Sequence, residues 1–229
     1  MLTILIGRAK TGKSDTMLRR MAELGEGSQQ ILLVPEHASH QAEVDVCSAC
    51  GDTASRHAEV LSFRRLGERV LSITGGIADV TLDNGGKLLT LQRALLETAP
   101  QMTVYRKPSQ KVGFLEQMLA LFDELRSYEV TPEILYRQAQ DIDGSTHDKL
   151  TDLSLLYAAY EARLRRPGLD ARDRMTKLCD HLEESGYVRG KDIFIDGFTY
   201  FNAQERRALA VFLRQARSVT VTLLGEVNS

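Results

Sequence analysis

Eight residues near the N-terminus follow the pattern G-x-x-x-x-G-K-[ST], which is typical of a loop that binds phosphate. The pattern is filled by Gly7, Arg8, Ala9, Lys10, Thr11, Gly12, Lys13 and Ser14. In such a loop, backbone N–H groups and a helix N-terminus face the phosphates. The lysine contributes a positive charge for the β- and γ-phosphates, and the hydroxyl binds Mg²⁺. We therefore expect Lys13 and Ser14 to take these two roles at a nucleotide site.

The loop lies between two elements that suit it. The apolar run Leu2–Ile6 predicts a buried strand before the loop, and apolar residues at helical spacing predict a helix after it. A second ligand for Mg²⁺, a carboxylate, is expected from Asp196, which follows the apolar strand pattern 192–195. Ligands of parallel α/β sheets bind at the carboxyl ends of the strands. We therefore expect Ser14 and Asp196 to share a magnesium ion.

Two other groups of residues could bind ligands. His37, His40, Cys47 and Cys50 are spaced as pairs that suit tetrahedral zinc. Basic residues gather around Arg64 and Arg65, where they favour either a solvated helix face or contact with nucleic-acid phosphates. A base could stack on Phe63 if that ring is exposed.

Composition limits the class of protein. The chain has 229 residues, 43% of them hydrophobic, and a net charge of −2, so any nucleic-acid contact must use a local patch. Three cysteines are too few for a disulfide framework. A signal peptide and an apolar run of membrane length are both missing from the sequence, from which we expect a soluble, cytoplasmic protein.

Strand patterns occupy the two ends of the sequence, and helix patterns occupy its middle. The predicted fold class is α/β, with a phosphate-loop core of parallel strands interrupted by an inserted all-helical subdomain. We expect the first half of the core at residues 1–78, the helical insertion at 79–187, and the second half of the core at 188–229. Further strands are expected at 30–34, 58–63 and 219–224, and a helix at 203–215.

Several segments resemble one protein family. The similarity lies in the phosphate loop, in residues 33–43 with Pro35-Glu36, in residues 61–66, and in residues 195–201 with Asp196-Gly197. These segments resemble AddB, the B subunit of the bacterial ATP-dependent helicase–deoxyribonuclease. The resemblance follows the motif order of UvrD-like helicases along the whole chain, which implies that the phosphate-loop core is RecA-like. Because AddB proteins are several times longer, the chain looks like an N-terminal fragment, without the second motor domain and the iron–sulfur nuclease domain.

The resemblance implies a role in double-strand-break repair by homologous recombination. It implies ATP and Mg²⁺ as ligands, an AddA-like helicase subunit as partner in a heterodimer, DNA as substrate, and no membrane. An iron–sulfur cluster is expected only in the missing C-terminal region. In related helicases the segment containing Phe63 and Arg64 lies along the path of single-stranded DNA, so Phe63, Arg64 and Arg65 are the expected nucleic-acid contacts.

Motor activity is not expected. Active relatives follow the magnesium-binding aspartate with a glutamate that activates water, and here Gly197 takes that position and offers no side chain. Only six residues precede Gly7, so an upstream adenine-reading glutamine motif has no place and poor adenine discrimination is expected. Two alternatives remain open: a phosphate-loop phosphotransferase, and an inactivated scaffold domain for a partner helicase subunit.

Overall fold

The computed structural model describes residues 1–75, 82–107, 113–166, 169–170 and 172–225. The chain divides into two compact units, one made of Met1–Ile77 with Arg174–Ser229 and the other of Ala78–Asp173. The α-helices and strands of the first unit are β1 (Leu2–Gly7), α1 (Lys13–Leu24), β2 (Gln30–Leu33), α2 (Ser39–Cys50), β3 (Ala58–Leu61), α3 (Phe63–Thr74), α8 (Arg174–Ser185), β6 (Asp192–Ile195), α9 (Ala203–Gln215) and β7 (Ser218–Leu224).

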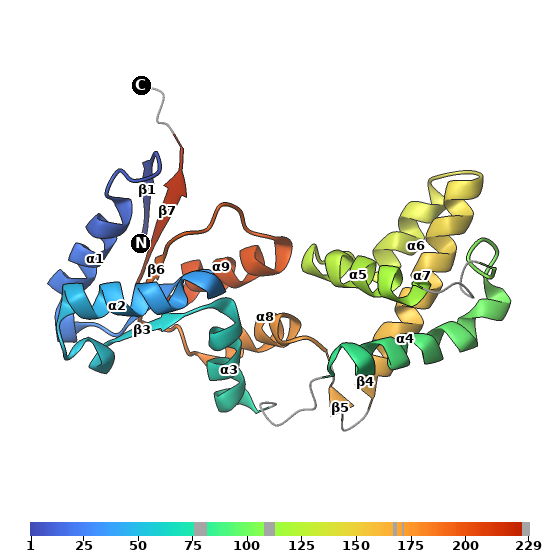
Figure 1. Cartoon of the computed structure of the whole chain (residues 1–229), viewed down its shortest axis with the longest axis horizontal. Coiled ribbons are helices and arrows are strands. Elements are labelled where there is room, and N and C mark those ends of the chain that lie inside the picture. The colour runs from blue at the N-terminus through green and yellow to red at the C-terminus, as the bar shows by residue number, and fades with distance from the viewer. Residues whose placement is uncertain (76–81, 108–112, 167–168, 171, 226–229) are drawn as a thin grey trace. The chain divides into compact units, whose positions relative to one another are not determined.

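A five-stranded, all-parallel sheet forms the centre of the first unit (Figure 1). Its strand order is β1-β7-β6-β2-β3, so strands from both ends of the sequence lie in one sheet. This confirms the predicted α/β class and the parallel pairing of the two halves of the core. Parallel neighbours require crossover connections, and in proteins these are almost always right-handed.

Two apolar layers cover the sheet. One face packs against α3, α8 and α9, with Ile193, Ile195 and Phe212 in its core. The other face packs against α1 and α2, with Met17 and Phe194 in its core. Alternate residues of each central strand enter opposite layers, and β2 and β6 are therefore buried along their whole length.

The first strand differs from the expectation of a buried strand. Leu2, Ile4 and Ile6 are 50%, 48% and 47% exposed, because β1 is an edge strand that pairs only with β7 among the described residues. The third strand also ends earlier than expected, at Leu61. Ser62 accepts a hydrogen bond from the backbone N–H of Arg65 and begins α3 as its N-cap.

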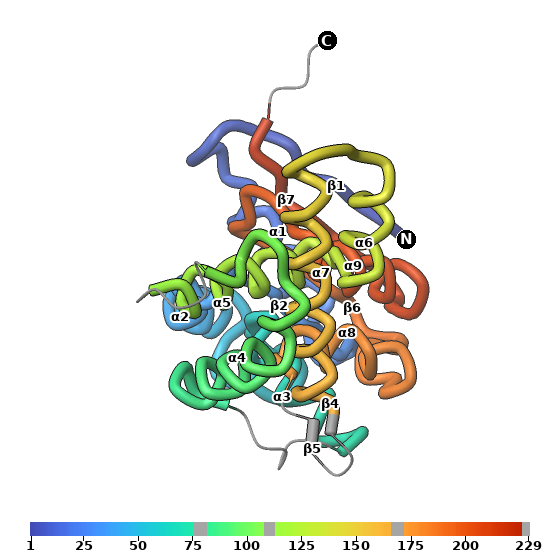
Figure 2. The backbone as a smooth tube through the Cα atoms, turned by 90° about the vertical axis from the view of Figure 1, so that its right-hand side faces the viewer, coloured from blue at the N-terminus to red at the C-terminus, as the bar shows by residue number. Residues whose placement is uncertain are grey.

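The described part of the second unit contains helices and one short hairpin. Its elements are α4 (Asn84–Thr98), α5 (Phe114–Ser127), α6 (Pro132–Gln140), α7 (Ser145–Leu164), β4 (Arg165–Arg166) and β5 (Leu169–Asp170). Helices α6 and α7 lie side by side (Figures 1 and 2). The rings of Phe122 and Tyr157 stack at 4.6 Å in the core of this unit. Helix α8, assigned to the insertion from sequence, packs instead against α3 and α9 of the first unit.

A buried carboxylate organises the second unit. Both oxygens of Asp152 accept hydrogen bonds from three consecutive backbone N–H groups, those of residues 103–105, at 2.7–3.0 Å. Elsewhere in the unit, the buried Arg126 pairs with Asp123, Glu161 and Asp173. Each of these charges has the partners that burial requires, so the network is compatible with a stable core.

Candidate phosphate loop and carboxyl-edge pocket

The glycine–lysine loop connects the end of β1 to the first turn of α1. Gly12 has φ 78° and directly precedes Lys13, the first residue of the helix. A Cβ atom at Gly7 would lie 2.7 Å from the Thr11 hydroxyl, and that hydroxyl donates a hydrogen bond of 2.8 Å to the carbonyl of Arg8. The chain therefore turns tightly on itself, and a side chain at position 7 would collide with Thr11.

Lys10 adopts a left-handed conformation with φ 62°. Glycine is the residue that adopts positive φ without cost, because it has no Cβ atom. A lysine in this region costs about 1–2 kcal/mol relative to glycine. The loop therefore carries strain that a glycine would remove.

The lysine expected to bind phosphate is folded back onto the loop. Its Nζ donates to the carbonyls of Gly7 at 2.8 Å and Arg8 at 2.6 Å. Ser14 follows it in the first turn of α1. To reach a phosphate, the Lys13 ammonium has to exchange two charge-assisted hydrogen bonds for new ones, so its gain on binding is reduced.

Asp196 lies at the same edge of the sheet, but one strand away from the loop. It follows β6, and β7 separates β6 from β1. Neighbouring strands are about 4.8 Å apart, so the two chain segments leave the sheet about 10 Å from each other. The Asp196 carboxylate already accepts hydrogen bonds from the Thr222 hydroxyl of β7 and the Gly197 N–H. The structure thus brings Ser14 and Asp196 to one edge without giving them a direct contact.

Gly197 takes a conformation that other residues rarely adopt. Its φ is 79°, and a Cβ atom there would lie 3.3 Å from Cδ of Pro35. The two residues belong to segments that follow neighbouring strands, β6 and β2. A glutamate at this position would meet both backbone strain and crowding. The position therefore opposes a water-activating carboxylate by geometry as well as by residue type.

A pocket of about 620 Å³ opens at the carboxyl ends of β2, β3 and β6. Its wall is partly aromatic: the half-buried Phe63 meets Phe198 edge-on at 5.7 Å, and Phe198 stacks on Phe201 at 5.0 Å. Tyr200, another lining residue, is 73% exposed. Phe63 could be singled out from the sequence and Tyr200 was not, although the aromatic run after the β6 pattern was a usable signal.

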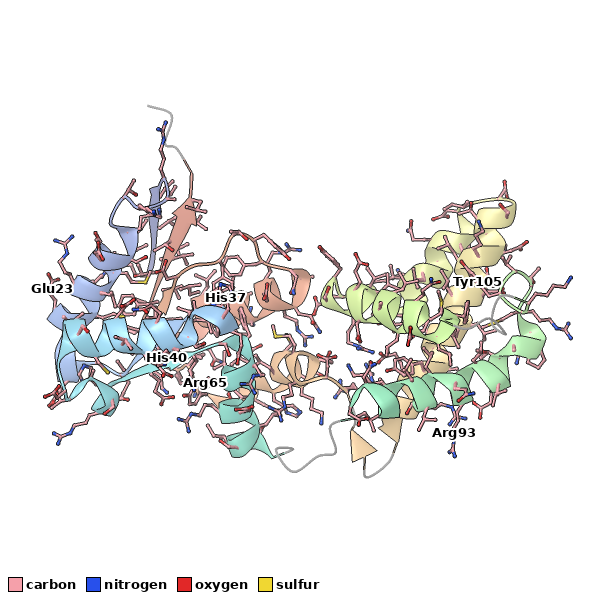
Figure 3. The ribbon with its side chains drawn as sticks, viewed as in Figure 1. Glu23, His37, His40, Arg65, Arg93 and Tyr105 are labelled. Atoms are coloured by element: carbon pink, nitrogen blue, oxygen red, sulfur yellow. The ribbon has the colours of Figure 1, made fainter. Side chains whose placement is uncertain are left out.

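The two arginines expected to contact nucleic acid are held by carboxylates. Arg64 makes a two-pronged contact with Glu36 at 2.7 and 3.0 Å, and Arg65 pairs with Glu43. Hydrogen bonds from Arg64, and then from Ser62, hold the pKa of Glu36 below its ordinary value. Figure 3 shows Arg65 at the start of α3. This pairing lowers the net positive charge that the surface offers to a phosphate.

The histidine and cysteine pairs do not form a metal centre in the described part of the chain. No group of three or more His, Cys, Asp or Glu side chains that could hold a metal ion occurs there. His37 precedes α2 and His40 lies in its first turn (Figure 3), whereas Cys47 and Cys50 lie at the other end of that twelve-residue helix. A helix rises 1.5 Å per residue, which keeps the two pairs about 10 Å apart. Cys179 is buried, as expected for a core residue.

The chain has the features of a doubly wound α/β protein. These are the parallel sheet, the loop between its first strand and first helix, and the pocket at its carboxyl edge. The chain belongs to the AddB family: the family model described as ADDB, N-terminal, matches residues 4–229. None of the helices in the described part of the chain has both the length and the hydropathy that crossing a bilayer requires.

Curated relatives match over nearly the whole chain. The B subunit of the ATP-dependent helicase/deoxyribonuclease of Clostridioides difficile (strain 630) is 31% identical over 235 residues, which cover 99% of this chain and 20% of that protein. The protein of the same name from Moorella thermoacetica is 34% identical over 232 residues, 97% of this chain and 20% of the relative. The Desulforudis audaxviator protein is 33% identical over 237 residues, with 100% and 20% coverage. The chain thus spans about one fifth of the length of these relatives.

Proposed function

We propose that this chain is the N-terminal segment of an AddB-type subunit of a helicase–deoxyribonuclease that acts in DNA double-strand-break repair by homologous recombination. The observation that carries the proposal is the family match over residues 4–229, together with relatives that are named as the B subunit of an ATP-dependent helicase/deoxyribonuclease. The proposed partner is an AddA-like helicase subunit, the proposed substrate is DNA, and the proposed compartment is the cytoplasm.

The phosphate loop is proposed to bind ATP weakly and with little discrimination against other nucleotides. Gly7 and Gly12 allow the tight turn of the loop, and the N-terminus of α1 favours negative charge. Lys13 would hold the terminal phosphates after leaving the two loop carbonyls. Ser14 and Asp196 would hold Mg²⁺, which neutralises phosphate charge when it is bound.

The same site is proposed not to turn ATP over at a motor-like rate. The position after Asp196 has no side chain, and its positive φ and contact with Pro35 oppose a replacement. Because no base orients water, the bound nucleotide would act as a structural or regulatory ligand and would not be hydrolysed at an appreciable rate.

Single-stranded DNA is proposed to bind at the aromatic pocket near Phe63. Exposed Tyr200 offers a ring face on which a base can stack, while Phe63 is partly covered by Phe198. Because Arg64 and Arg65 are paired with Glu36 and Glu43, stacking rather than charge is expected to supply most of the affinity.

A second candidate function is a scaffold domain that binds its partner subunit and no nucleotide. The observation that favours it is the closed position of the Lys13 ammonium on the loop carbonyls. The two candidates differ in what the loop binds, since only the first predicts an affinity for nucleotide that depends on this lysine.

Calorimetric titration of the chain with ATP and GTP in the presence of Mg²⁺ tests the proposal. The proposal predicts weak binding of both nucleotides that Lys13→Ala abolishes, with Lys87→Ala in the second unit as a control that retains binding. Tight binding of ATP alone would contradict the proposed poor discrimination. No measurable binding of either nucleotide would favour the scaffold.

A further inference from the structure

A groove of about 680 Å³ runs along the edge strand β3. All four residues of the strand line it, and helices α2 and α3 form its two walls (Figure 1). Within the described part of the chain, β3 pairs only with β2, so the groove lies on its unpaired side. The groove shares no lining residue with the aromatic pocket near Phe63 and is therefore a separate feature of the first unit.

The outer side of β3 presents hydrogen-bonding groups of the backbone. The carbonyls of His57 and Leu61, at the two ends of the strand, accept hydrogen bonds from backbone N–H groups of the β2 segment. Because these polar groups alternate in direction along a strand, those of Ala58 and Val60 point into the groove. Backbone groups of this kind are matched by another extended polypeptide, which adds to the sheet as a strand.

Arg65 occupies part of this edge. Its guanidinium pairs with Glu43 on the opposite wall and lies 3.5 Å from the Val60 carbonyl, which is the outer limit of a hydrogen bond. The two paired side chains are 40% and 43% exposed, so water competes with their contact. Arg65 therefore closes the edge by weak contacts that an incoming strand can replace.

The two walls of the groove differ in chemistry. The α2 side contains Val46 and Ala54, which belong to the apolar core of that layer. The α3 side contains Arg65 and, one helical turn further on, Arg69. Side chains of an added strand point alternately to the two walls. The groove therefore suits a segment in which apolar residues alternate with acidic ones.

Two further glutamates line the groove, and each has partners of its own. Glu59 accepts a hydrogen bond of 2.8 Å from the Tyr187 hydroxyl. Glu68 pairs with Arg64 and Arg174, neither of which lines the groove. Because these carboxylates are compensated, the exposed arginines of the α3 wall remain able to take an acidic side chain from an added strand.

We propose that an extended segment of the partner subunit, with apolar and acidic residues in alternation, adds to the sheet beside β3 in this groove. Its backbone pairs with Ala58 and Val60, and its acidic side chains take Arg65 and Arg69 from their present partners. The inference rests on the proposed function, which supplies the partner subunit, and it adds the surface and the chemistry by which that subunit is held.

Amide hydrogen exchange with residue-level fragmentation tests the proposal on a full-length subunit that carries this chain, without nucleotide or DNA. The Ala58 and Val60 amides are expected to exchange at least about 100-fold more slowly in the complex with the partner subunit than in the subunit alone. The Glu59 and Leu61 amides, which point to β2, are internal controls and are expected to be protected in both samples.

The other results overturn the proposal, each for a different reason. Protection of Ala58 and Val60 in the subunit alone would assign the edge to its own polypeptide or, if protection rises with concentration, to a second copy. A complex in which these two amides exchange as fast as in the subunit alone would overturn the docking and leave the proposed function intact. Failure of the two subunits to associate would overturn the proposed partner as well.

A matched pair of variants tests the charge of the α3 wall. Arg69→Glu is expected to weaken association with the partner subunit at least about 10-fold in biolayer interferometry, because it sets like charges against each other in the groove. Arg214→Glu, on α9 outside the groove, removes a similarly exposed arginine from an ion pair and is expected to change the affinity by less than about twofold. Equal affinities of the two variants would overturn the proposal.

Discussion

Gly197 is the position at which a substitution tests most sharply why the carboxyl edge lacks a catalytic acid. We expect Gly197→Glu to destabilise the first unit and not to create ATP turnover. A non-glycine residue at φ 79° costs about 1–2 kcal/mol. The 3.3 Å approach of Cβ to Pro35 requires a further local shift, which brings the expected loss of unfolding free energy to about 1–3 kcal/mol.

Three glycine-to-alanine variants separate these causes in urea denaturation. Gly27 has neither positive φ nor an atom within 4 Å of the added Cβ, so its variant is expected to be close to neutral. Gly190 has φ 72° and open space, so its variant reports backbone strain alone. Gly197→Ala should lose the most stability of the three. Equal stability of the Gly197 and Gly27 variants would refute the reasoning.

Three further predictions concern buried charge and the aromatic pocket. Asp152→Ala should lower the unfolding free energy of the second unit by about 3 kcal/mol in denaturant titration, because the N–H groups of residues 103–105 lose their buried acceptor; a loss below about 1 kcal/mol would contradict this. Burial raises the pKa of Asp192, but hydrogen bonds from Arg217, Ser218 and Ser28 outweigh it, and the folded pKa lies below the ordinary value. The ionised Asp192 therefore stabilises the fold fully above the unfolded pKa of about 3.9, and this stabilisation is lost as the pH falls through the folded pKa. In thermal melts between about pH 2 and 6, the melting temperature should fall at low pH, and Asp192→Asn should reduce that fall. An unchanged fall in the variant would count against the assignment. Tyr200→Ala should weaken binding of a fluorescent single-stranded oligonucleotide about 5- to 100-fold, and equal affinity of variant and parent would exclude stacking on this ring.

The features that depend on neighbouring residues could be predicted from the sequence. The phosphate loop lies between a strand and a helix as expected, and the helix predicted at 203–215 is α9. The capping box formed by Asn202 and Glu205 shows how local side chains set the start of that helix. Such signals act over three or four residues, so they can be recognised in the sequence without knowledge of the fold.

Features that depend on strand order could not be predicted in the same way. Leu2–Ile6 has the composition of a buried strand, and only the order β1-β7-β6-β2-β3 makes it an edge. The pairing of Arg64 with Glu36 joins residues 28 apart in sequence, across the ends of two strands. The contact between Gly197 and Pro35 likewise exists only because β6 lies beside β2. These contacts change the expected roles of the arginines and of the glycine.

Steady-state ATPase activity of the chain, with and without single-stranded DNA and with Lys13→Ala as control, tests the central claim most directly. We expect weak, lysine-dependent nucleotide binding without turnover above the Lys13→Ala background, because no carboxylate follows Asp196 to activate water. Lys13-dependent turnover of about one per second or faster, an ordinary rate for an enzyme, would contradict it.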